Sequence, residues 1–387
     1  MEKIKKDYKR KLIQLYQTKS YWILYPIMQK KYKQKDNEVL FLSDSREDFS
    51  GNFEFVKKEI EKRKKYHITG IFSKNFKEKK NNTFKQRINL LKKMCIAKYI
   101  FVDDFYPNIY TIKFIKQKKI IQLWHAMGAF KTVGYARLGK PGGPRGLNYT
   151  HRNYTGCIVS GDGIVKDYAK AFGISVDKVH SLGIPRTDIF FDKEYKENII
   201  KKLYKEYPIL KDKKVILFAP TFRGNGKEHA YYDYSWVDFK KLKEEFKDEY
   251  VCIIKMHPFI HNEPDYDFEN DDFYLDLTKN REVNDLLFVT DLLITDYSSI
   301  IFEYSFFKKP VIFYTPDFDD YINSRSFFYD FEKYNYGVRA NDFEHLLKAI
   351  RKSKVDNKKL DKFYNYFCGA CDGNSTKKVV DFFLDEK

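Results

Sequence analysis

The sequence has few cysteines, and their pattern argues against both disulfide and metal chemistry. There are five, an odd number, and Cys95, Cys157 and Cys252 lie in apolar or mixed runs where a reduced core thiol is the usual explanation. Cys368 and Cys371 form a C-x-x-C near the C-terminus, but no second pair accompanies it and no β-α redox unit follows. We therefore expect a protein of a reducing compartment whose thiols are structural.

Signals for secretion and for membrane spans are also absent. Residues 1–19 contain many Lys and Arg and lack the apolar stretch of a signal peptide. An apolar run such as 292–307 is interrupted by Asp296 and Glu303, and falls short of the ~20 apolar residues of a spanning helix. Any membrane contact is therefore expected to be peripheral.

What the sequence has in excess is positive charge. Lys and Arg number 72 against 54 Asp and Glu, which gives a formal net charge of +18. A positive surface field favours polyanionic partners, namely nucleic acid, phosphorylated polymers or an anionic bilayer leaflet. Charge alone does not choose among them, because a Lys-rich excess often only solvates a surface.

The length and the apolar pattern predict two α/β domains. A chain of 387 residues suits two domains of roughly 150 to 200 residues each. Short apolar runs alternate with helical patterns in two sets, which predicts two Rossmann-like halves with parallel sheets facing a central cleft. The runs are 39–43, 99–102, 119–124 and 156–160, then 214–219, 250–255, 291–295 and 310–314. We place the boundary in the charged helical segment 193–210 and expect domains of 1–195 and 196–387, the first opening with a basic, aromatic helix over about 35 residues.

In an open parallel sheet, ligands bind beyond the carboxyl ends of the strands, so residues that follow the apolar runs are the candidates for function. His125 follows one such run and is suited to general base work because its unperturbed pKa lies near neutrality. Gly128 would let a substrate approach, and the Gly/Pro-rich basic loop 139–145 is typical of a substrate loop. A capping or core role is the ordinary alternative for a lone histidine.

Three further strand ends carry polar residues. Arg223, beside glycines, could hold a diphosphate with its planar fork, or simply pair with a carboxylate. Lys255 and His257 could offset charge that develops on a leaving group.

The segment Thr295-Asp296-Tyr-Ser298-Ser299 is a strand end and a hydroxyl-rich turn before a helix. Its serines could cap the helix and its first amides could bind an anion. Glu303 could reach a ribose diol or simply face solvent.

These strand ends share a chemistry of phosphates. The sequence has neither an H-E-x-x-H metal motif nor a G-x-x-x-x-G-K-[ST] loop. We therefore expect recognition of a nucleoside diphosphate without a P-loop.

The ordered set of motifs resembles the CDP-glycerol glycerophosphotransferase family of teichoic-acid enzymes, which have a GT-B-like pair of Rossmann domains. The resemblance spans most of the chain. It rests on residues 41–54, 102–105, 124–125, 183–188, 219–223, 255–258, 295–299 and 372–375. The motifs W-H-A-M-G-A-F-K at 124–131 and T-F-R-G-N-G at 221–226 are similar to those of the ribitol phosphate branch. Ala126 stands where the commoner family form has glycine.

The resemblance implies that His125 is the base that deprotonates the acceptor hydroxyl, which attacks the β-phosphorus of a CDP-activated polyol and releases CMP. His257 would stabilise the pyrophosphate, and Arg223, Ser298 and Ser299 would bind phosphate. The second domain would hold the cytidine and the first would face the acceptor.

The resemblance also implies the partners and the location. These are a lipid-linked polymer acceptor and the anionic surface of the cytoplasmic face of the cell membrane, to which the protein would bind peripherally. No cofactor is expected, and assistance by Mg²⁺ is left open. Family polymerases often carry an N-terminal extension that we expect this chain to lack, which leaves both primer addition and polymerisation open.

Two other functions remain to be separated from this one. A GT-B glycosyltransferase would use a nucleotide sugar and release UDP, because fold does not fix function. A basic nucleic-acid-binding protein is supported by charge and aromatics only, and we expect no specific nucleic acid.

Overall fold

The computed structural model describes residues 20–72, 84–140, 143–144, 146, 150–224, 226–269, 271–279, 282–324 and 326–385. The chain divides into two compact units. Unit 1 comprises Met1–Asp188 and Phe367–Lys387, and unit 2 comprises Ile189–Tyr366. Of the expected N-terminal helix, residues 20–31 are helical and residues 1–19 lie outside the described residues.

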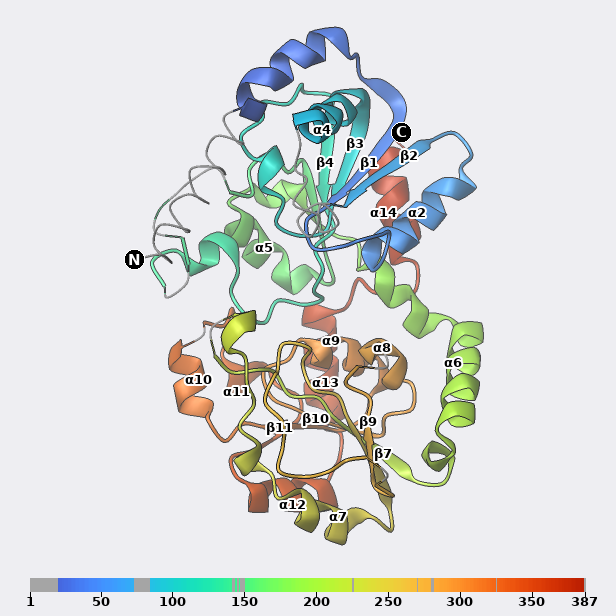
Figure 1. The fold of residues 1–387 in the computed structure, drawn as a ribbon, viewed down its shortest axis with the longest axis vertical. Helices are drawn as coiled ribbons and strands as arrows, with labels where there is room; N and C mark the ends of the chain where they lie inside the picture. The colour runs from blue at the N-terminus through green and yellow to red at the C-terminus, as the bar shows by residue number, and fades with distance from the viewer. Residues whose placement is uncertain are drawn as a thin grey trace. The chain divides into compact units, whose positions relative to one another are not determined.

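Unit 1 is built on a parallel sheet with the strand order β2-β1-β3-β4-β5-β6 in the described residues (Figure 1). Its strands are β1 (Lys35–Ser43), β2 (His67–Phe72), β3 (Ala97–Val102), β4 (Lys119–Gln122), β5 (Gly156–Val159) and β6 (Val179–Ser181). Its helices are residues 20–31, α2 (Asn52–Lys62), α4 (Phe84–Ile96), α5 (Val165–Phe172) and α14 (Ser375–Leu384).

Unit 2 repeats this plan with the strand order β12-β11-β10-β7-β8-β9, again all parallel. Its strands are β7 (Lys214–Phe218), β8 (Tyr250–Ile254), β9 (Tyr274–Asp276), β10 (Leu292–Thr295), β11 (Val311–Tyr314) and β12 (Val338–Ala340). Its helices are α6 (Lys193–Glu206), α7 (Phe239–Phe246), α8 (Val283–Leu286), α9 (Ile300–Tyr304), α10 (Phe318–Ser324), α11 (Phe331–Tyr334), α12 (Phe343–Arg351) and α13 (Asn357–Phe367).

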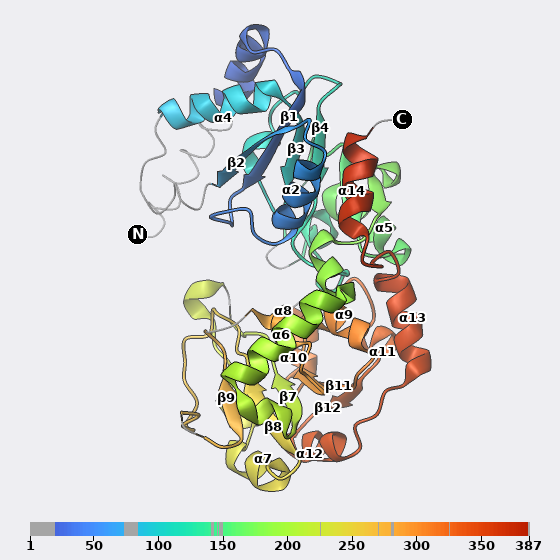
Figure 2. The same ribbon diagram turned by 90° about the vertical axis from the view of Figure 1, so that its right-hand side faces the viewer.

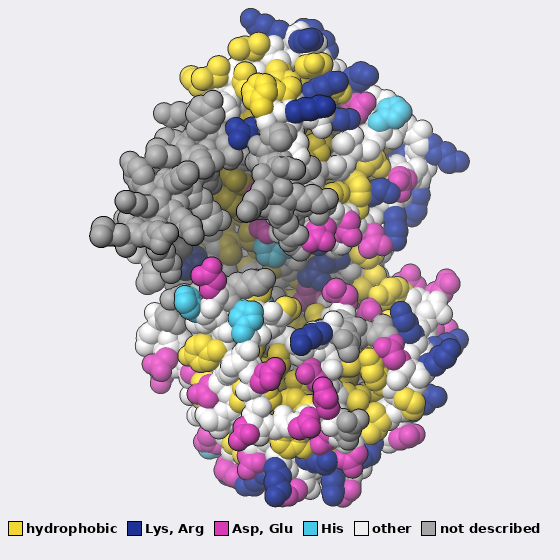
Figure 3. Space-filling view, viewed as in Figure 1, with side chains coloured by type: hydrophobic (Ala, Val, Ile, Leu, Met, Phe, Trp, Pro, Cys, Tyr) yellow, Lys and Arg dark blue, Asp and Glu magenta, His cyan; other side chains and the backbone are white. Residues whose placement is uncertain are grey.

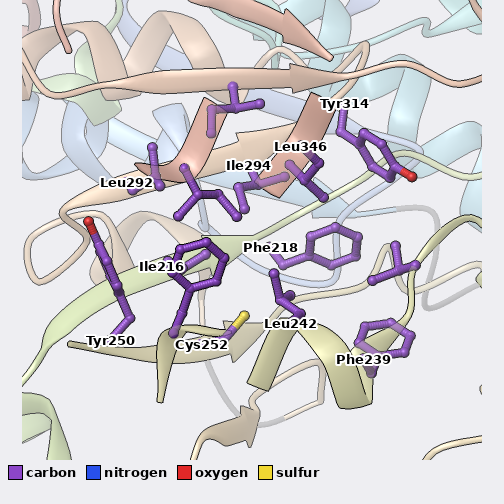
Figure 4. Close-up of a cluster of buried hydrophobic side chains, with 14 of the residues drawn as sticks. Ile216, Phe218, Phe239, Leu242, Tyr250, Cys252, Leu292, Ile294, Tyr314 and Leu346 are labelled. Atoms are coloured by element: carbon purple, nitrogen blue, oxygen red, sulfur yellow. The ribbon is translucent and has the colours of Figure 1, made fainter. Parts of the chain in front are cut away.

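The strands of unit 2 are apolar on both faces because helices cover both sides of the sheet. Alternate residues of β7, β8, β10 and β11, such as Ile216 and Ile294, form one buried cluster with Leu242 of α7 and Leu346 of α12 (Figure 4). On the other side, Phe302 of α9 stacks on Phe363 of α13, with ring centroids 5.3 Å apart. Continuous burial on two faces explains why these segments read as unbroken apolar runs.

Aspartates set the start of several helices. Asp192, Asp238 and Asp342 each accept a hydrogen bond from a backbone N–H in the first turn of α6, α7 and α12. Such caps satisfy donors that the helix itself leaves unpaired. At the other end of α5, Gly173 adopts φ +61°, a left-handed conformation that glycine tolerates best.

The C-terminal segment returns to unit 1, which differs from the expected division into 1–195 and 196–387. Helix α14 lies beside α2 in both views (Figure 1, Figure 2). Arg63 pairs with Asp381 of α14 and with Asp385, which follows this helix. The backbone N–H groups of Ser375 and Thr376 donate to Asp188 at 2.9 and 2.8 Å. These contacts assign Phe367–Lys387 to unit 1, and the boundary falls at Asp188 and Ile189.

Candidate functional site

In unit 1, His125 lies just beyond β4, and Asp104 lies just beyond the neighbouring strand β3. The His125 Nδ1 is 3.6 Å from Asp104 Oδ1, and the two side chains are 45% and 30% exposed. The same carboxylate oxygen accepts a hydrogen bond from the Phe105 N–H at 2.7 Å. Because parallel strands bring their carboxyl ends to one edge, the sheet itself pairs these two side chains.

The residue before His125 has an unusual backbone. Trp124 adopts φ +54°, which is uncommon for a bulky residue. Both of its backbone polar groups are held by buried side chains. Its N–H donates to Gln122 Oε1 at 2.8 Å, and its carbonyl accepts from Asn52 Nδ2 at 2.8 Å. The turn that presents His125 is therefore fixed from both sides.

Gly128 has a structural task in the same loop. Its φ is +67°, its N–H donates to Ser160 Oγ at 3.0 Å, and its carbonyl accepts from the Tyr168 hydroxyl at 2.8 Å. Both backbone groups are thus bonded within the protein, whereas we expected this glycine to face a substrate. Of the predicted substrate loop 139–145, residues 141–142 and 145 lie outside the described part of the chain.

A second histidine lies near this edge but is buried. His151 is 4% exposed and its Nδ1 is 3.2 Å from the Tyr154 hydroxyl. Its ring packs against Phe172, with centroids 4.8 Å apart. Burial lowers the pKa of His151 to about 4, although Asp104 acts in the opposite direction. His151 is therefore neutral near pH 7, and His125 is the histidine of this edge that reaches solvent.

In unit 2, Arg223 follows β7 and is buried in a network of carboxylates. Its NH1 donates to Asp296 Oδ2 at 2.9 Å, and its Nε and NH2 donate to Asp317 at 2.6 and 3.0 Å. Burial disfavours the charged form, but Asp296 and Asp317 outweigh this and raise the pKa of Arg223. The guanidinium also lies over the rings of Trp236 and Tyr321, 5.2 and 4.9 Å from their centroids.

This network differs from the phosphate contact that we expected for Arg223. All three guanidinium nitrogens donate to protein oxygens, because Asp296 and Asp317 follow the neighbouring strands β10 and β11. Asp296 also accepts from the Thr221 N–H, and the Thr295 hydroxyl donates to the Ala219 carbonyl. The structure thus brings Arg223, Thr295 and Asp296 together as a brace between the ends of β7, β10 and β11.

His257 follows β8 and faces the loop after β7. Its Nδ1 accepts a hydrogen bond from the Phe259 N–H at 3.1 Å, which leaves the proton of a neutral imidazole on Nε2. The ring packs against Phe222 and Phe259, with centroid distances of 4.7 and 4.8 Å. Because two aromatic side chains hold the imidazole ring, its Nε2–H is a suitable donor to a phosphate oxygen.

Lys255 points toward the neighbouring strand β9. Its Nζ donates to the carbonyls of Leu277 and Thr278 at 2.9 Å each. Burial lowers the pKa of Lys255, and Glu282 and Asp276 act in the opposite direction. Lys255 therefore joins the ends of β8 and β9.

The turn after β10 differs in detail from the expected capped helix. Ser298 Oγ accepts from the Ile300 N–H at 3.3 Å, and Ser299 occupies the N-cap position of α9 without a side-chain capping bond. Helix α9 has five residues. Glu303 lies within it and is 3% exposed, so it does not face solvent.

Sequence reasoning missed the residues that support these side chains. Asp104, Gln122 and Asn52 hold the His125 turn, and Asp317 holds Arg223. Asp104 and Asp317 do follow apolar runs, so the strand-end rule could have found them. Gln122 is the last residue of β4 and Asn52 the first residue of α2, and neither position carries a local signal of its role.

Two α/β units, each a parallel sheet with polar side chains beyond its strand ends, define a GT-B-like protein. The structure of the wall teichoic acid polymerase TagF matches this fold with a TM-score of 0.74 over 96% of this chain and 94% of that chain, at 22% identity. The chain belongs to the CDP-glycerol:poly(glycerophosphate) glycerophosphotransferase family, whose model matches residues 23–385.

Two curated relatives come from Bacillus spizizenii. A teichoic acid poly(ribitol-phosphate) polymerase is 45% identical over 348 residues, which cover 90% of this chain and 56% of the relative. A teichoic acid ribitol-phosphate primase is 36% identical over 358 residues, which cover 89% of this chain and 90% of the relative. The chain therefore spans little more than half the length of the polymerase and most of the length of the primase.

Proposed function

We propose that this protein transfers ribitol phosphate from CDP-ribitol to a hydroxyl of a teichoic-acid-type polymer and releases CMP. The proposal is supported by the family match over residues 23–385 and by the similarity to a ribitol-phosphate primase, 90% of whose length aligns with this chain. CDP-glycerol is the donor to compare, because the family description names glycerophosphate.

The residues of the two units divide the chemistry between them. His125 takes the proton of the acceptor hydroxyl, whose oxygen then attacks the β-phosphorus of the donor. A new P–O bond to the acceptor forms as the bond from the β-phosphorus to the bridging oxygen breaks. CMP leaves with that oxygen, and His257 donates from Nε2 to a phosphate oxygen that gains charge.

The other predicted site residues have mainly structural roles in this proposal. Arg223, Thr295 and Asp296 fix the strand ends of unit 2 through bonds within the protein. Lys255 joins the ends of β8 and β9. Ser298 and Ser299 remain candidates to bind a donor phosphate.

Metal assistance is a separate question. In the described residues, no group of three or more His, Cys, Asp and Glu side chains is placed to hold a metal ion. The expectation that no resident cofactor takes part stays a prediction, which activity measured with EDTA and with added Mg²⁺ would test.

We further propose that the protein works at an anionic membrane surface, through the helix at residues 20–31. Trp22, Ile23 and Ile27 lie on one face of this helix and are 54%, 53% and 61% exposed, while Tyr21 and Tyr25 on the opposite face are buried. Exposed lysines at 30, 31 and 33 follow. Hydrophobic and basic side chains gather at this end of unit 1 (Figure 3). Aromatic and apolar residues beside lysines are typical of helices that lie in the membrane interface.

No helix among the described residues is long and apolar enough to cross a membrane.

Nucleotide release tests the proposed reaction. Purified protein is given CDP-ribitol, CDP-glycerol or a UDP-sugar with a lipid-linked primer, and the released nucleotide is measured. We expect CMP, faster from CDP-ribitol than from CDP-glycerol, and a loss on the order of 10²-fold or more in His125→Ala and His257→Ala. UDP release would support the glycosyltransferase instead, and no release from folded protein with a competent primer would reject the proposal.

A further inference from the structure

His125 and Asp104 lie within ion-pair distance, slightly too far apart for a hydrogen bond in this structure. Asp104 Oδ1 is 3.6 Å from the Nδ1 of His125, so the carboxylate faces Nδ1, and Nε2 lies on the other side of the ring. A carboxylate at Nδ1 favours the tautomer with the proton on Nδ1, and the lone pair then lies on Nε2. Nε2 is the nitrogen that would take a proton from a hydroxyl.

The aspartate next to Asp104 is already paired. Asp103, next to Asp104, is fully buried and pairs with Arg46. Burial raises the pKa of Asp103, and Arg46 acts in the opposite direction. Of the two neighbouring aspartates, Asp104 is thus the one directed at His125.

The buried side chain of Gln122 links Asp104 to the turn that presents His125. Gln122 Nε2 donates to the Asp104 carbonyl at 3.1 Å, and Gln122 Oε1 accepts from the Trp124 N–H at 2.8 Å. Its Nε2 also donates to the Tyr154 hydroxyl at 2.8 Å. A single amide thus joins the backbone of Asp104 to the backbone of the residue before His125, and it is fully buried.

We propose that Asp104 is a positioning residue that fixes the tautomer and orientation of His125, and that Gln122 holds Asp104 and the His125 turn in register. The inference rests on the proposed function, because it assigns His125 as the base. As the acceptor proton arrives on Nε2, the imidazole becomes a cation and the Asp104 carboxylate stabilises it. The carboxylate acts through His125 and does not itself contact the acceptor.

The tautomer can be observed without any substrate. In protein labelled with ¹⁵N-histidine, the signals of His125 are assigned by their loss in His125→Ala, and ¹H–¹⁵N correlations report which nitrogen carries the proton. We expect Nδ1–H and an unprotonated Nε2 in the wild type at a pH where the ring is neutral. In Asp104→Ala we expect this preference to be lost. The same tautomer in both proteins would overturn the proposal.

Kinetics then test whether Asp104 works through His125. We expect Asp104→Asn to lower kcat by about 10²-fold and to change the KM for the donor by less than about twofold. The double variant with His125→Ala should be no slower than His125→Ala alone, because residues that act as a unit are not additive. Asp177→Asn, on an exposed turn of unit 1, serves as the control with unchanged rates.

The outcomes separate this inference from the proposed function. A wild type that is inactive with every CDP-polyol but has the expected tautomer would reject the function alone. An active wild type whose kcat is unchanged by Asp104→Asn would reject the inference alone. Gln122→Leu, shown to be folded by circular dichroism, should lose the tautomer preference while Asp104 is still present, and an unchanged preference would remove Gln122 from the proposal.

Discussion

At the scale of single residues, the structure assigns different tasks to side chains of the same type. His125 is 45% exposed and lies beside Asp104, whereas His151 is buried among tyrosines and phenylalanines. Arg223 is charged but enclosed by carboxylates and aromatic rings. Exposure and partners, more than residue type, therefore decide which side chains can meet a substrate.

The burial of His151 predicts a loss of stability in acid. Its pKa is lowered to about 4 in the folded state from an ordinary value of 6.5, so the unfolded chain binds more protons between these values. The free energy of unfolding should therefore fall as the pH drops from 6.5 through 4, by up to about 3 kcal/mol from this residue. Urea unfolding of the wild type and His151→Gln at pH 7 and pH 4.5 measures the difference.

The His151→Gln variant should lose less stability between the two pH values than the wild type does. His67→Gln, on the exposed start of β2, is the control and should behave as the wild type. Equal losses in the wild type and His151→Gln would contradict the assignment of this pH dependence to His151.

Local sequence predicted the positions of the candidate residues better than their partners. His125, His257 and Arg223 all follow strands, as the apolar runs indicated. The partners of Arg223 lie 73 and 94 positions further along the chain, and no local pattern connects them. An arginine at a strand end is compatible with a ligand contact or a carboxylate pair, and only the sheet order decides between them.

At the scale of elements, the ends of adjacent strands form the working edge of each sheet. In unit 2, β11, β10, β7 and β8 are neighbours, so Asp317, Asp296, Arg223 and His257 follow four consecutive positions in the sheet. The runs predicted for these strands are confirmed. Strands β2, β6, β9 and β12 were not predicted, because they are short or carry polar residues and pair only at or near the sheet edges.

The brace between these strand ends should contribute strongly to the stability of unit 2. In Asp317→Asn the buried Arg223 loses one of its two carboxylates, and removing one partner of a buried pair costs about 3–5 kcal/mol. The sequence has three tryptophans, and Trp236 is the one in unit 2. Its fluorescence during urea unfolding, in protein with Trp22 and Trp124 replaced by Phe, reports on this unit.

The matched control is Asp319→Asn, which changes an exposed aspartate at the start of α10. It should shift the unfolding midpoint little. Equal midpoints for Asp317→Asn and Asp319→Asn would show that Arg223 does not depend on Asp317.

At the scale of the whole molecule, the chain crosses from unit 1 to unit 2 and returns. The sequence indicated two α/β units, and the first crossing lies a few residues before the charged segment 193–210. The return of Phe367–Lys387 was not predicted. It depends on contacts such as the pair of Arg63 and Asp381, which lie 318 positions apart. Such long-range pairing leaves no trace in the apolar periodicity of α14 itself.

The exposed helix face of unit 1 predicts binding to anionic membranes. Replacing Trp22, Ile23 and Ile27 by serine should weaken binding to phosphatidylcholine vesicles that contain phosphatidylglycerol by at least about tenfold, because ~1.4 kcal/mol of apolar transfer suffices for that factor. Vesicle sedimentation measures the bound fraction. High salt should also weaken binding, since the lysines contribute through the surface potential.

The control is Phe382→Ser, which changes an exposed apolar residue of α14 and should leave vesicle binding unchanged. If the triple variant sediments with vesicles as well as the wild type does, residues 20–31 are not the membrane contact.

The product of the reaction tests the central claim most directly. The purified chain is incubated with CDP-ribitol and a lipid-linked primer, and the primer is examined by mass spectrometry and ³¹P NMR. The proposed function predicts that the primer gains one or more ribitol phosphate units through new phosphodiester bonds, with one CMP released for each unit. A primer that stays unchanged while the protein is folded and the primer is competent, or one that gains a sugar from a UDP donor instead, would contradict it.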